Sequence, residues 1–488
     1  MIIIGGGLAG LSAGIALAES GYRVRLFEKR PFLGGRAASY LLPSGEHVDN
    51  CQHVTLGCCT NLEDFYRRAG ALQKLRFFDR LVFADARGRC AIVKPSILPA
   101  PFHLAPSFLF FRGLDWKDKR VIGRAMMEIV RAGGRLSPED EAKDMTMLEW
   151  LRRQGQTQRS IERFWRVVLV SALDEELDRA DARYGIEVFW KAFLANRCGC
   201  RLGVPAVPLA ELYDGCREAV EKLGGEVRLR APVRRVLVAD GRVGGMQLDD
   251  GSVESAEFNV LATPPSAVAA LLPRELAAQD PAISGLGNLR VSPITGVHLW
   301  FDRTVLREPF LTLLGTTSQW VFNKSVLYGR AAEGEAAPDQ RRAPGSRNSE
   351  GNEAGASAQY LQIVISASYA LVEKSRQEII DLCLDELRQV LPAAREARLL
   401  KAAVIKEAEA TFSPAPGCDR WRLGPKGPLP GLFLAGDWTA TGWPATMESA
   451  VCSGYLAAEA ILAQDGRPRR FVQPDLPVET LVRWLARR

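Results

Sequence analysis

The sequence holds 488 residues, of which 47% are hydrophobic and 25% are charged. A chain of this length is too long for one simple core, so we expect two intertwined domains around a sizeable interior. The net charge of +6 is mild at this length and does not favour a nucleic-acid partner.

The ten cysteines follow neither a disulfide framework nor the spacing of paired zinc ligands. We therefore expect reduced thiols packed as small apolar groups, and no metal site. No apolar run is long enough to span a bilayer, and a strand that begins at Ile2 leaves no room for a secretory signal.

The first residues predict a buried strand, a glycine-rich turn and a helix. Three β-branched residues, Ile2–Ile4, precede the pattern Gly-x-Gly-x-x-Gly. Its glycines permit a tight turn, the approach of a pyrophosphate to the backbone, and close packing of helix on strand. The residues expected to contact the cofactor here are Gly5, Gly7, Leu8, Ala9 and Gly10.

A second strand over Tyr22–Phe27 delivers Glu28, eighteen positions after Gly10. An acid about 20 residues beyond the glycines can accept hydrogen bonds from a ribose. Glu28, rather than a basic residue, favours a free ribose, and so FAD or NAD rather than NADP.

A second glycine pair, Gly34 and Gly35, follows Lys29, and Arg36 comes directly after it. Glycines let the backbone approach a ligand, and the Arg36 guanidinium is suited to a bidentate bond with phosphate. A plain NAD site does not need this element, whereas a long flavin dinucleotide does. We therefore expect FAD, with Lys29, Gly34, Gly35 and Arg36 at its site.

Polar residues crowd together in the stretch Asp49–Gly57. One interpretation is a loop facing the isoalloxazine ring, with Gln52 and His53 as hydrogen-bond or proton donors. The alternative is a turn whose polar side chains satisfy backbone groups.

The stretches Gly34–Ala37 and Asp49–Gly57 together resemble hydroxysqualene dehydroxylase, a family first described as squalene-associated FAD-dependent desaturases. It is a branch of the amine oxidase and phytoene desaturase superfamily of flavoproteins. Cys51 stands where that family usually has glycine.

A third cofactor element is predicted near the end of the chain. A buried strand leads to Gly436 and Asp437, whose carboxylate can accept from a ribityl hydroxyl, and a helix follows from about Ala445 to Leu462. Thr446 and Met447 lie at its N-terminus, where the helix dipole would stabilise negative charge on the reduced ring. The stretch Asp437–Gly454 is similar to the dehydroxylase family almost position by position, whereas Arg420–Arg422 departs from it and receives no role.

Two apolar stretches are candidates for a substrate channel. Ile92–Phe111 is broken by prolines and suits core filling, the mouth of an apolar channel, or a surface that touches a membrane. Phe164–Leu173 could line a greasy cavity. The acidic run Asp174–Asp178 that follows reads as a solvated face, where the dehydroxylase pattern has a neutral Asn-Thr-Pro.

The predicted fold class is α/β: a Rossmann-like FAD-binding domain of the glutathione-reductase and amine-oxidase type, with an inserted α+β substrate domain. Segments 1–66, 204–290 with a β-meander, and 401–465 would form the first domain. Segments 67–203, mostly helical, and 291–400, a mixed sheet with a disordered insertion at 331–358, would form the second, and 466–488 is a tail. The resemblance places the Val233 backbone beside the adenine.

The resemblance implies that hydroxysqualene is reduced to squalene, in squalene and hopanoid biosynthesis. The hydroxyl leaves as water, a hydride from reduced flavin quenches the developing cation, and the protein supplies orientation and electrostatics. A general acid must help the hydroxide leave. His53 is the candidate, with Asp49 as its orienting partner and Gln52 beside it.

Other interpretations stay open. A carotenoid or phytoene-type desaturase would use the same fold and cofactor with the electron flow reversed. A flavin amine oxidase is less favoured, and a FAD-binding scaffold of a terpenoid-forming complex is the non-enzymatic alternative.

The expected partners are a long apolar isoprenoid and upstream squalene-pathway enzymes. The tail from Val478 would form a short helix, apolar on one side and basic on the other, which could touch a membrane surface or pack on the body. We expect a cytoplasmic protein with a peripheral contact at the inner face of the cell membrane.

Overall fold

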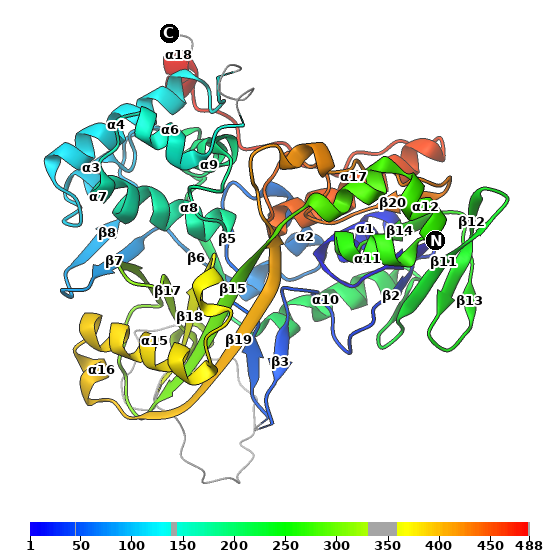
Figure 1. Ribbon diagram of the computed structural model, residues 1–488, viewed down its shortest axis with the longest axis horizontal. Coiled ribbons are helices and arrows are strands. Elements are labelled where there is room, and N and C mark those ends of the chain that lie inside the picture. Colours follow the sequence, from blue (N-terminus) through cyan, green and yellow to red (C-terminus); the bar gives the residue numbers. More distant parts are fainter. Residues whose placement is uncertain (44, 138–143, 330–358, 487–488) are drawn as a thin grey trace.

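The computed structural model describes residues 1–43, 45–137, 144–329 and 359–486. The predicted insertion at 331–358 lies entirely outside these ranges, so that prediction is not tested. Figure 1 shows the parallel sheet with its helices on the right, a second sheet at the lower left and a group of helices at the upper left.

A five-stranded parallel sheet forms the cofactor domain. Its strands are short, and their order draws on three distant parts of the chain: β10 (Glu226–Arg228), β2 (Arg25–Phe27), β1 (Ile2–Ile4), β14 (Asn259–Leu261) and β20 (Leu432–Leu434). The alternation of strand side chains sends Ile3 to one face and Ile2 and Ile4 to the other. The predicted α/β class with a Rossmann-like sheet is confirmed.

Helices cover one face of this sheet and a meander covers the other. Ile3 packs with α1 (Leu8–Ala18), α10 (Leu209–Lys222) and α17 (Met447–Gln464). Ile2 and Ile4 share a core with residues of the antiparallel meander, which consists of β11 (Val233–Ala239), β12 (Arg242–Leu248) and β13 (Val253–Glu254). The cofactor-binding turn therefore sits at the end of a strand that is buried on both sides.

A seven-stranded mixed sheet forms the second layer. Its order is β19 (Leu399–Phe412), β15 (Val291–Phe301), β18 (Gln359–Ile365), β17 (Trp320–Asn323), β16 (Phe310–Leu314), β7 (Leu81–Asp85) and β8 (Cys90–Val93). The helix α15 (Arg376–Val390) packs against it through the same apolar core.

This sheet corrects one domain boundary. The predicted third cofactor segment starts at 401, but β19 pairs with β15 along almost its whole length. The strand therefore belongs to the second sheet, and the cofactor segment starts only after Phe412. Composition could not show this, because β19 alternates like any strand and its partner lies about a hundred residues away.

The group of helices at the upper left of Figure 1 includes α4 (Trp116–Arg131), α6 (Met147–Arg153), α8 (Arg166–Leu173) and α9 (Ala182–Phe189). Trp165 and Leu169 are fully buried, and the rings of Trp165 and Phe189 lie 4.6 Å apart. The inner face of the predicted cavity-lining stretch Phe164–Leu173 thus fills the core.

Smaller elements complete the described chain. They are β3 (Ser39–Leu41), β4 (His47–Asp49), β5 (Thr55–Leu56), β6 (Leu75–Phe78), β9 (Leu202–Pro205), α2 (Thr60–Arg68), α3 (Ala105–Leu109), α7 (Gln158–Ser160), α11 (Pro265–Leu271), α12 (Arg274–Gln279), α13 (Pro281–Gly285), α14 (Lys324–Leu327), α16 (Ala393–Glu396) and α18 (Thr480–Ala486). Among the described helices, none has both the length and the apolar composition needed to cross a bilayer.

Candidate cofactor and active site

The first glycine turn is shaped by backbone contacts that exclude side chains. Gly5 has φ of +107°, and a Cβ there would lie 2.3 Å from the Ala262 carbonyl oxygen. A Cβ at Gly10 would lie 2.0 Å from the Gly5 carbonyl oxygen. Only glycine at both positions lets strand, turn and helix meet so closely.

The N-terminus of α1 is open to an anion. Gly7 caps it without a side-chain hydrogen bond, and the first turn holds no acidic residue. The first amides of a helix have no partner within the helix and carry its positive dipole end. The backbone at Leu8 and Ala9 therefore fits a dinucleotide phosphate without rearrangement.

The second glycine pair lies against the first. The Gly34 amide donates to the Gly6 carbonyl at 2.8 Å, and a Cβ at Gly35 would lie 3.0 Å from the Gly7 Cα. Two backbones that touch without side chains form the narrow cradle that a long dinucleotide requires.

Glu28 is buried and held in place by backbone amides. Its Oε2 accepts from the Gly6 amide at 2.6 Å, and its Oε1 accepts from the Arg30 amide at 2.8 Å. A carboxylate oxygen has a second lone pair, so both oxygens can still accept from a ribose. The Ala231 amide donates to the Glu28 carbonyl at 2.9 Å, so Val233, two residues further along the chain, lies near Glu28. Lys29, which was also predicted as a cofactor contact, is exposed.

Arg36 and Asp437, predicted as separate cofactor ligands, pair with each other. An Arg36 Nη lies 2.5 Å from Asp437 Oδ1, and the other donates to the Ala410 carbonyl at 2.7 Å. Burial opposes the charge, but the Asp437 carboxylate outweighs it and raises the pKa of Arg36. The Arg36–Asp437 pair therefore joins the second and third cofactor elements. Arg36 already has partners within the chain, so it is not a dedicated phosphate ligand.

The third element leads into α17 through a capped turn. Thr446 is the N-cap and accepts from the Ser449 amide at 3.1 Å, and the Gly436 amide donates to Ser453 Oγ at 2.8 Å. Met447 opens the helix, and its sulfur accepts from the Tyr66 hydroxyl at 3.8 Å. The N-terminus of α17 thus follows Gly436 and Asp437 as predicted.

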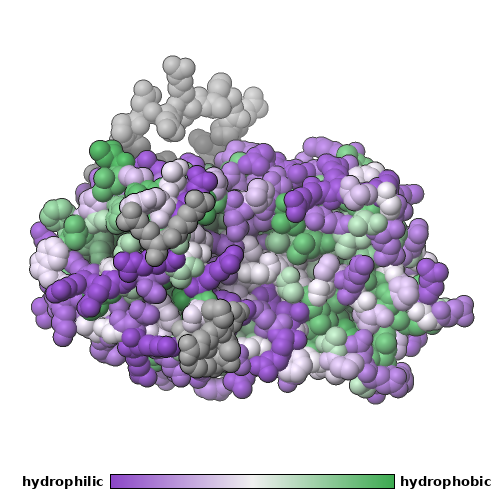
Figure 2. Space-filling view, turned by 90° about the horizontal axis from the view of Figure 1, so that it is seen from above, coloured by the Kyte–Doolittle hydropathy of each residue, from purple (hydrophilic) through white to green (hydrophobic). Residues whose placement is uncertain are grey.

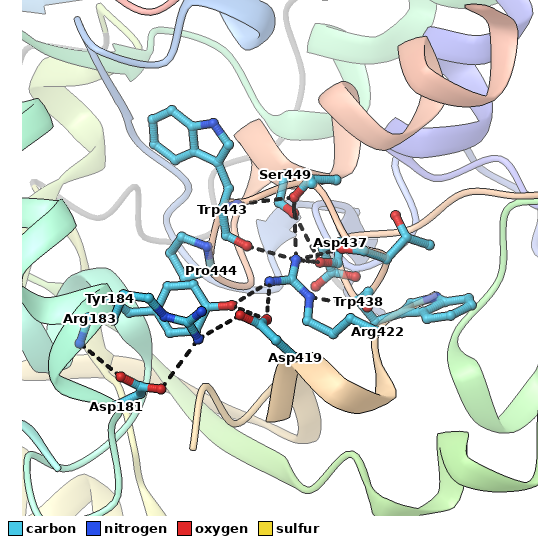
Figure 3. Close-up of polar contacts among 12 residues, drawn as sticks. Asp181, Arg183, Tyr184, Asp419, Arg422, Asp437, Trp438, Trp443, Pro444 and Ser449 are labelled. Carbon is cyan, nitrogen blue, oxygen red and sulfur yellow. Dashed lines mark hydrogen bonds and ion pairs between the residues drawn. The ribbon is translucent and has the colours of Figure 1, made fainter. Parts of the chain in front are cut away.

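Arg422, which the sequence left without a role, holds this turn together (Figure 3). Its guanidinium is buried and donates to the carbonyls of Asp437, Trp438, Thr439 and Trp443 at 2.6–3.3 Å. On the other side it meets the Tyr184 hydroxyl at 2.5 Å and Asp419 Oδ1 at 3.1 Å. A planar group with five donors satisfies several carbonyls at once, in a fixed geometry that a lysine ammonium with three donors cannot reproduce.

Asp49 does not orient His53, and that prediction is wrong. The buried Asp49 carboxylate accepts from Ser39 Oγ at 2.7 Å, Lys324 Nζ at 2.7 Å and the Tyr328 hydroxyl at 2.8 Å. Burial alone would raise its pKa, but the Lys324 ammonium and these donors together lower it. Asp49 is therefore an ionised anchor of the loop.

Lys324 is a site residue that sequence reasoning missed. It starts α14, is fully buried, and also donates to Gln52 Oε1 at 2.6 Å. Burial lowers its pKa, against the opposing effect of Asp49. The one signal in the sequence is a lysine directly after the apolar strand Trp320–Asn323, and nothing there reveals that its partner lies 275 residues away.

His53 is poorly suited to the acid role predicted for it. Its Nδ1 lies 2.9 Å from the Cys51 carbonyl, which can only accept, so the proton sits on Nδ1. Burial lowers the pKa of His53, so the ring is neutral at neutral pH and its Nε2 is an acceptor. Gln52 donates to the His53 carbonyl at 3.2 Å, so the loop satisfies part of its own backbone.

The acidic run Asp174–Asp178 is only partly a solvated face, because Asp174 and Glu175 are buried. Asp174 ends α8 in the left-handed conformation and accepts from the Ala367 amide at 2.7 Å and Thr411 Oγ1 at 2.9 Å. Burial raises the pKa of Asp174 to about 8. It therefore holds a proton at neutral pH, and its partner Thr411 directly follows Ala410, whose carbonyl Arg36 contacts.

A second buried acid lies at the N-terminus of α17. Glu448 accepts from the Asn61 amide at 3.0 Å and the Leu62 amide at 2.7 Å, at the first turn of α2. Burial raises its pKa to about 7. This contact ties α17 to α2 beside the third cofactor element.

Residues 8–462 match the family model described as "Flavin containing amine oxidoreductase". The chain is 27% identical over 475 residues to a 15-cis-phytoene desaturase, chloroplastic/chromoplastic, of Capsicum annuum, covering 95% of this chain and 77% of that protein. It is also 27% identical over 483 residues to the zeta-carotene desaturase of a Synechocystis strain, covering 95% of this chain and 97% of that protein.

Two solved structures show the same fold. An oxidoreductase from Methanosarcina mazei has a TM-score of 0.70 at 16% identity, covering 95% of this chain and 99% of that one. A putrescine oxidase bound to putrescine has a TM-score of 0.66 at 17% identity, covering 95% and 98%. With the family match and the two glycine cradles, FAD is the cofactor, as the sequence predicted.

Proposed function

The chain belongs to the flavin-containing amine oxidoreductase family, and from this premise we propose that it is a FAD-dependent enzyme that reduces hydroxysqualene to squalene. What supports this proposal is the resemblance of the stretch Asp437–Gly454 to the dehydroxylase family. Arg422 and the Arg36–Asp437 pair hold the beginning of this stretch at the cofactor cradle.

The reaction needs a proton for the leaving hydroxyl, which departs as water, and a hydride for the carbon, which bound reduced FAD supplies. This chain's residues hold the loop and exclude water. Lys324 joins Asp49 and Gln52, and so keeps the His53 segment in one conformation. Asp174 replaces His53 as our candidate proton source, because it accepts from Thr411 beside the Ala410 carbonyl that Arg36 contacts and burial raises its pKa to about 8.

Desaturation of a carotenoid-type polyene is the second candidate, and the phytoene and zeta-carotene desaturase relatives favour it. Bound oxidised FAD would supply the hydride acceptor, the second hydrogen would leave as a proton to solvent, and the chain's own residues would orient a long hydrocarbon. Both candidates require the same cradle and the same dry interior.

One experiment separates the two. The purified protein is photoreduced without oxygen and mixed with hydroxysqualene. Return of the oxidised flavin spectrum together with squalene in the extract supports the dehydroxylase, whereas flavin that stays reduced rules it out for this substrate. Oxidised enzyme is then mixed with phytoene, and bleaching of the flavin supports the desaturase. Protein that neither carries nor takes up FAD would contradict both.

A further inference from the structure

Residues 94–107 form a closed loop with an apolar end. The Lys94 amide donates to Ser107 Oγ at 3.1 Å, that hydroxyl donates to the Lys94 carbonyl at 2.8 Å, and the Ser96 amide donates to the His103 carbonyl at 2.7 Å. At the far end Ile97 is 94% exposed.

More large apolar side chains are exposed just after this loop. Phe110 is 83% exposed and Trp116 is 70% exposed. We call the whole set the apolar tip; it consists of Ile97, Leu98, Phe102, Leu109, Phe110 and Trp116. Single exposed apolar residues are ordinary, but so many within one short stretch mark an interaction surface.

The base of the loop is firmly attached to the body. Glu479, just before α18, accepts from the Ala100 amide at 2.9 Å and from the Arg197 amide at 2.8 Å. The Arg197 guanidinium donates to the Ser96 carbonyl at 3.2 Å. The tip is therefore presented by a fixed framework, and its exposure does not come from a loose end.

Positive charge surrounds the apolar tip. Residues 92–135 hold eight Lys or Arg and three Asp or Glu, in a chain whose whole net charge is +6. Lys94, Arg112, Lys117 and Arg120 are exposed, while the Lys119 ammonium lies 5.2 Å from the centre of the Trp116 ring. Figure 2 shows hydrophobic residues beside strongly hydrophilic ones on its left, the side that carries α3 and α4 in Figure 1.

We propose that the apolar tip and its basic surround dock on the surface of an anionic phospholipid bilayer. Apolar and aromatic side chains enter the headgroup boundary, while Lys and Arg attract acidic lipids. A second copy of the chain is a poor occupant, because a symmetric contact would bring the two basic surrounds together.

A groove of about 670 Å³ opens beside the tip. Its lining comes from outside the cofactor motifs and consists of Pro99, Pro477, Val478, Leu481 and Trp484 with the polar or charged Asn196, Glu479, Thr480 and Arg483. Its lining is mostly apolar, so it suits a hydrocarbon chain at the bilayer surface. The docking itself does not depend on the proposed function, but it would bring a membrane-dissolved isoprenoid to the protein.

The test uses the FAD-loaded full-length protein and vesicles of phosphatidylcholine with a quarter of phosphatidylglycerol, in a sedimentation assay. The double variant Ile97→Glu/Phe110→Glu is expected to bind at least about tenfold more weakly. Each basic residue near an acidic surface contributes about fivefold, so Lys117→Gln should also weaken binding, and pure phosphatidylcholine should bind far less. Leu41→Glu, a matched control on β3 at 63% exposure, should bind like the wild type.

Equal binding of the double variant and the wild type would overturn the proposal. So would a dimer in sedimentation velocity that the double variant dissolves, without any vesicle binding, because it would show that the tip contacts another protein chain. Turnover of substrate in detergent is measured separately. Loss of turnover with intact vesicle binding contradicts only the proposed function, and the reverse contradicts only the docking.

Discussion

Lys324 and Asp49 form a buried ion pair whose members depend on each other. Both side chains are at most 1% exposed, and their charged atoms lie 2.7 Å apart. A charge taken out of water is costly unless it is paired and hydrogen-bonded. Hydrogen bonds with Ser39, Gln52 and Tyr328 satisfy the remaining polar atoms of the pair. The loop before His53 is therefore held by residues that are distant in the sequence.

We predict that Lys324→Met lowers the free energy of unfolding by about 3–5 kcal/mol, because it leaves Asp49 buried without its countercharge. Denaturant unfolding followed by circular dichroism measures this. Lys222→Met removes the lysine of an exposed pair, 75% and 67% exposed, and should cost less than about 1 kcal/mol. Equal losses in the two variants would contradict the role of Lys324.

Asp174 makes stability depend on pH. Its pKa is about 8 in the folded protein and near the ordinary 3.8 when unfolded. Between these values the folded state binds more protons, so the contribution of Asp174 to stability is full below about pH 4 and is lost as the pH rises towards 8. Glu448, with a pKa of about 7, also makes stability fall as the pH rises. Because Glu448 is present in every variant compared, its effect cancels in the differences between them.

We predict that Asp174→Asn flattens this slope, because asparagine keeps an acceptor for the Ala367 amide and cannot ionise. The free energy of unfolding at pH 8 should rise by at least about 2 kcal/mol. This is less than the whole pKa shift would give at roughly 1.4 kcal/mol per pKa unit. Melting temperatures from pH 4 to 8 measure it, with the exposed Asp178→Asn as control. A slope that survives in Asp174→Asn would refute this account. A proton donor must be protonated, so loss of the alkaline limb in the pH profile of turnover of the same variant would support Asp174 as proton source.

At the scale of elements, the turn between β20 and α17 has little structure of its own. Its carbonyls converge on Arg422, which is anchored by Tyr184 from α9 and by Asp419. A cofactor element at the end of the chain is thereby attached to the helical part of the second domain. Figure 3 shows this convergence.

We predict that Arg422→Lys weakens FAD binding at least tenfold and lowers unfolding free energy by about 3 kcal/mol, because an ammonium cannot replace the planar donor set. Flavin fluorescence titration of the apoprotein measures the first effect. Arg420→Lys is the matched control, since Arg420 is largely exposed and pairs with Asp144. A retained FAD affinity in Arg422→Lys would show that the turn holds its shape without the guanidinium.

At the scale of the whole molecule, three distant segments meet in one short parallel sheet. Each strand of that sheet has only three residues. Short strands provide few hydrogen bonds, so a ligand that touches all three segments should add much to their cohesion.

We predict that removal of FAD lowers the melting temperature, and that FAD at a thousand times its dissociation constant raises the free energy of unfolding by about 4 kcal/mol. Scanning calorimetry of apoprotein and reconstituted protein measures this. NAD is the control, because it offers the adenine and ribose but no flavin, and it should restore little. Full recovery with NAD would contradict the assignment of the second and third elements to FAD.

The sequence by itself determined the cofactor half of this protein. Gly5, Gly10 and Gly35 are dictated by backbone contacts that any larger residue would break, and such constraints are local enough to read from spacing. The acid after the second strand and the final strand–turn–helix are local in the same way. These local patterns therefore suffice to predict the fold class and the cofactor.

Tertiary structure alone decided which charged groups are buried and which strands pair. Lys324 and Asp49 are 275 residues apart, and β19 is assigned by pairing with β15. The burial of Asp174 depends on Ala367 and Thr411, which come from other elements. A charged residue looks the same in a sequence whether it faces water or a distant partner, because the energy that decides its ionisation comes from the folded surroundings.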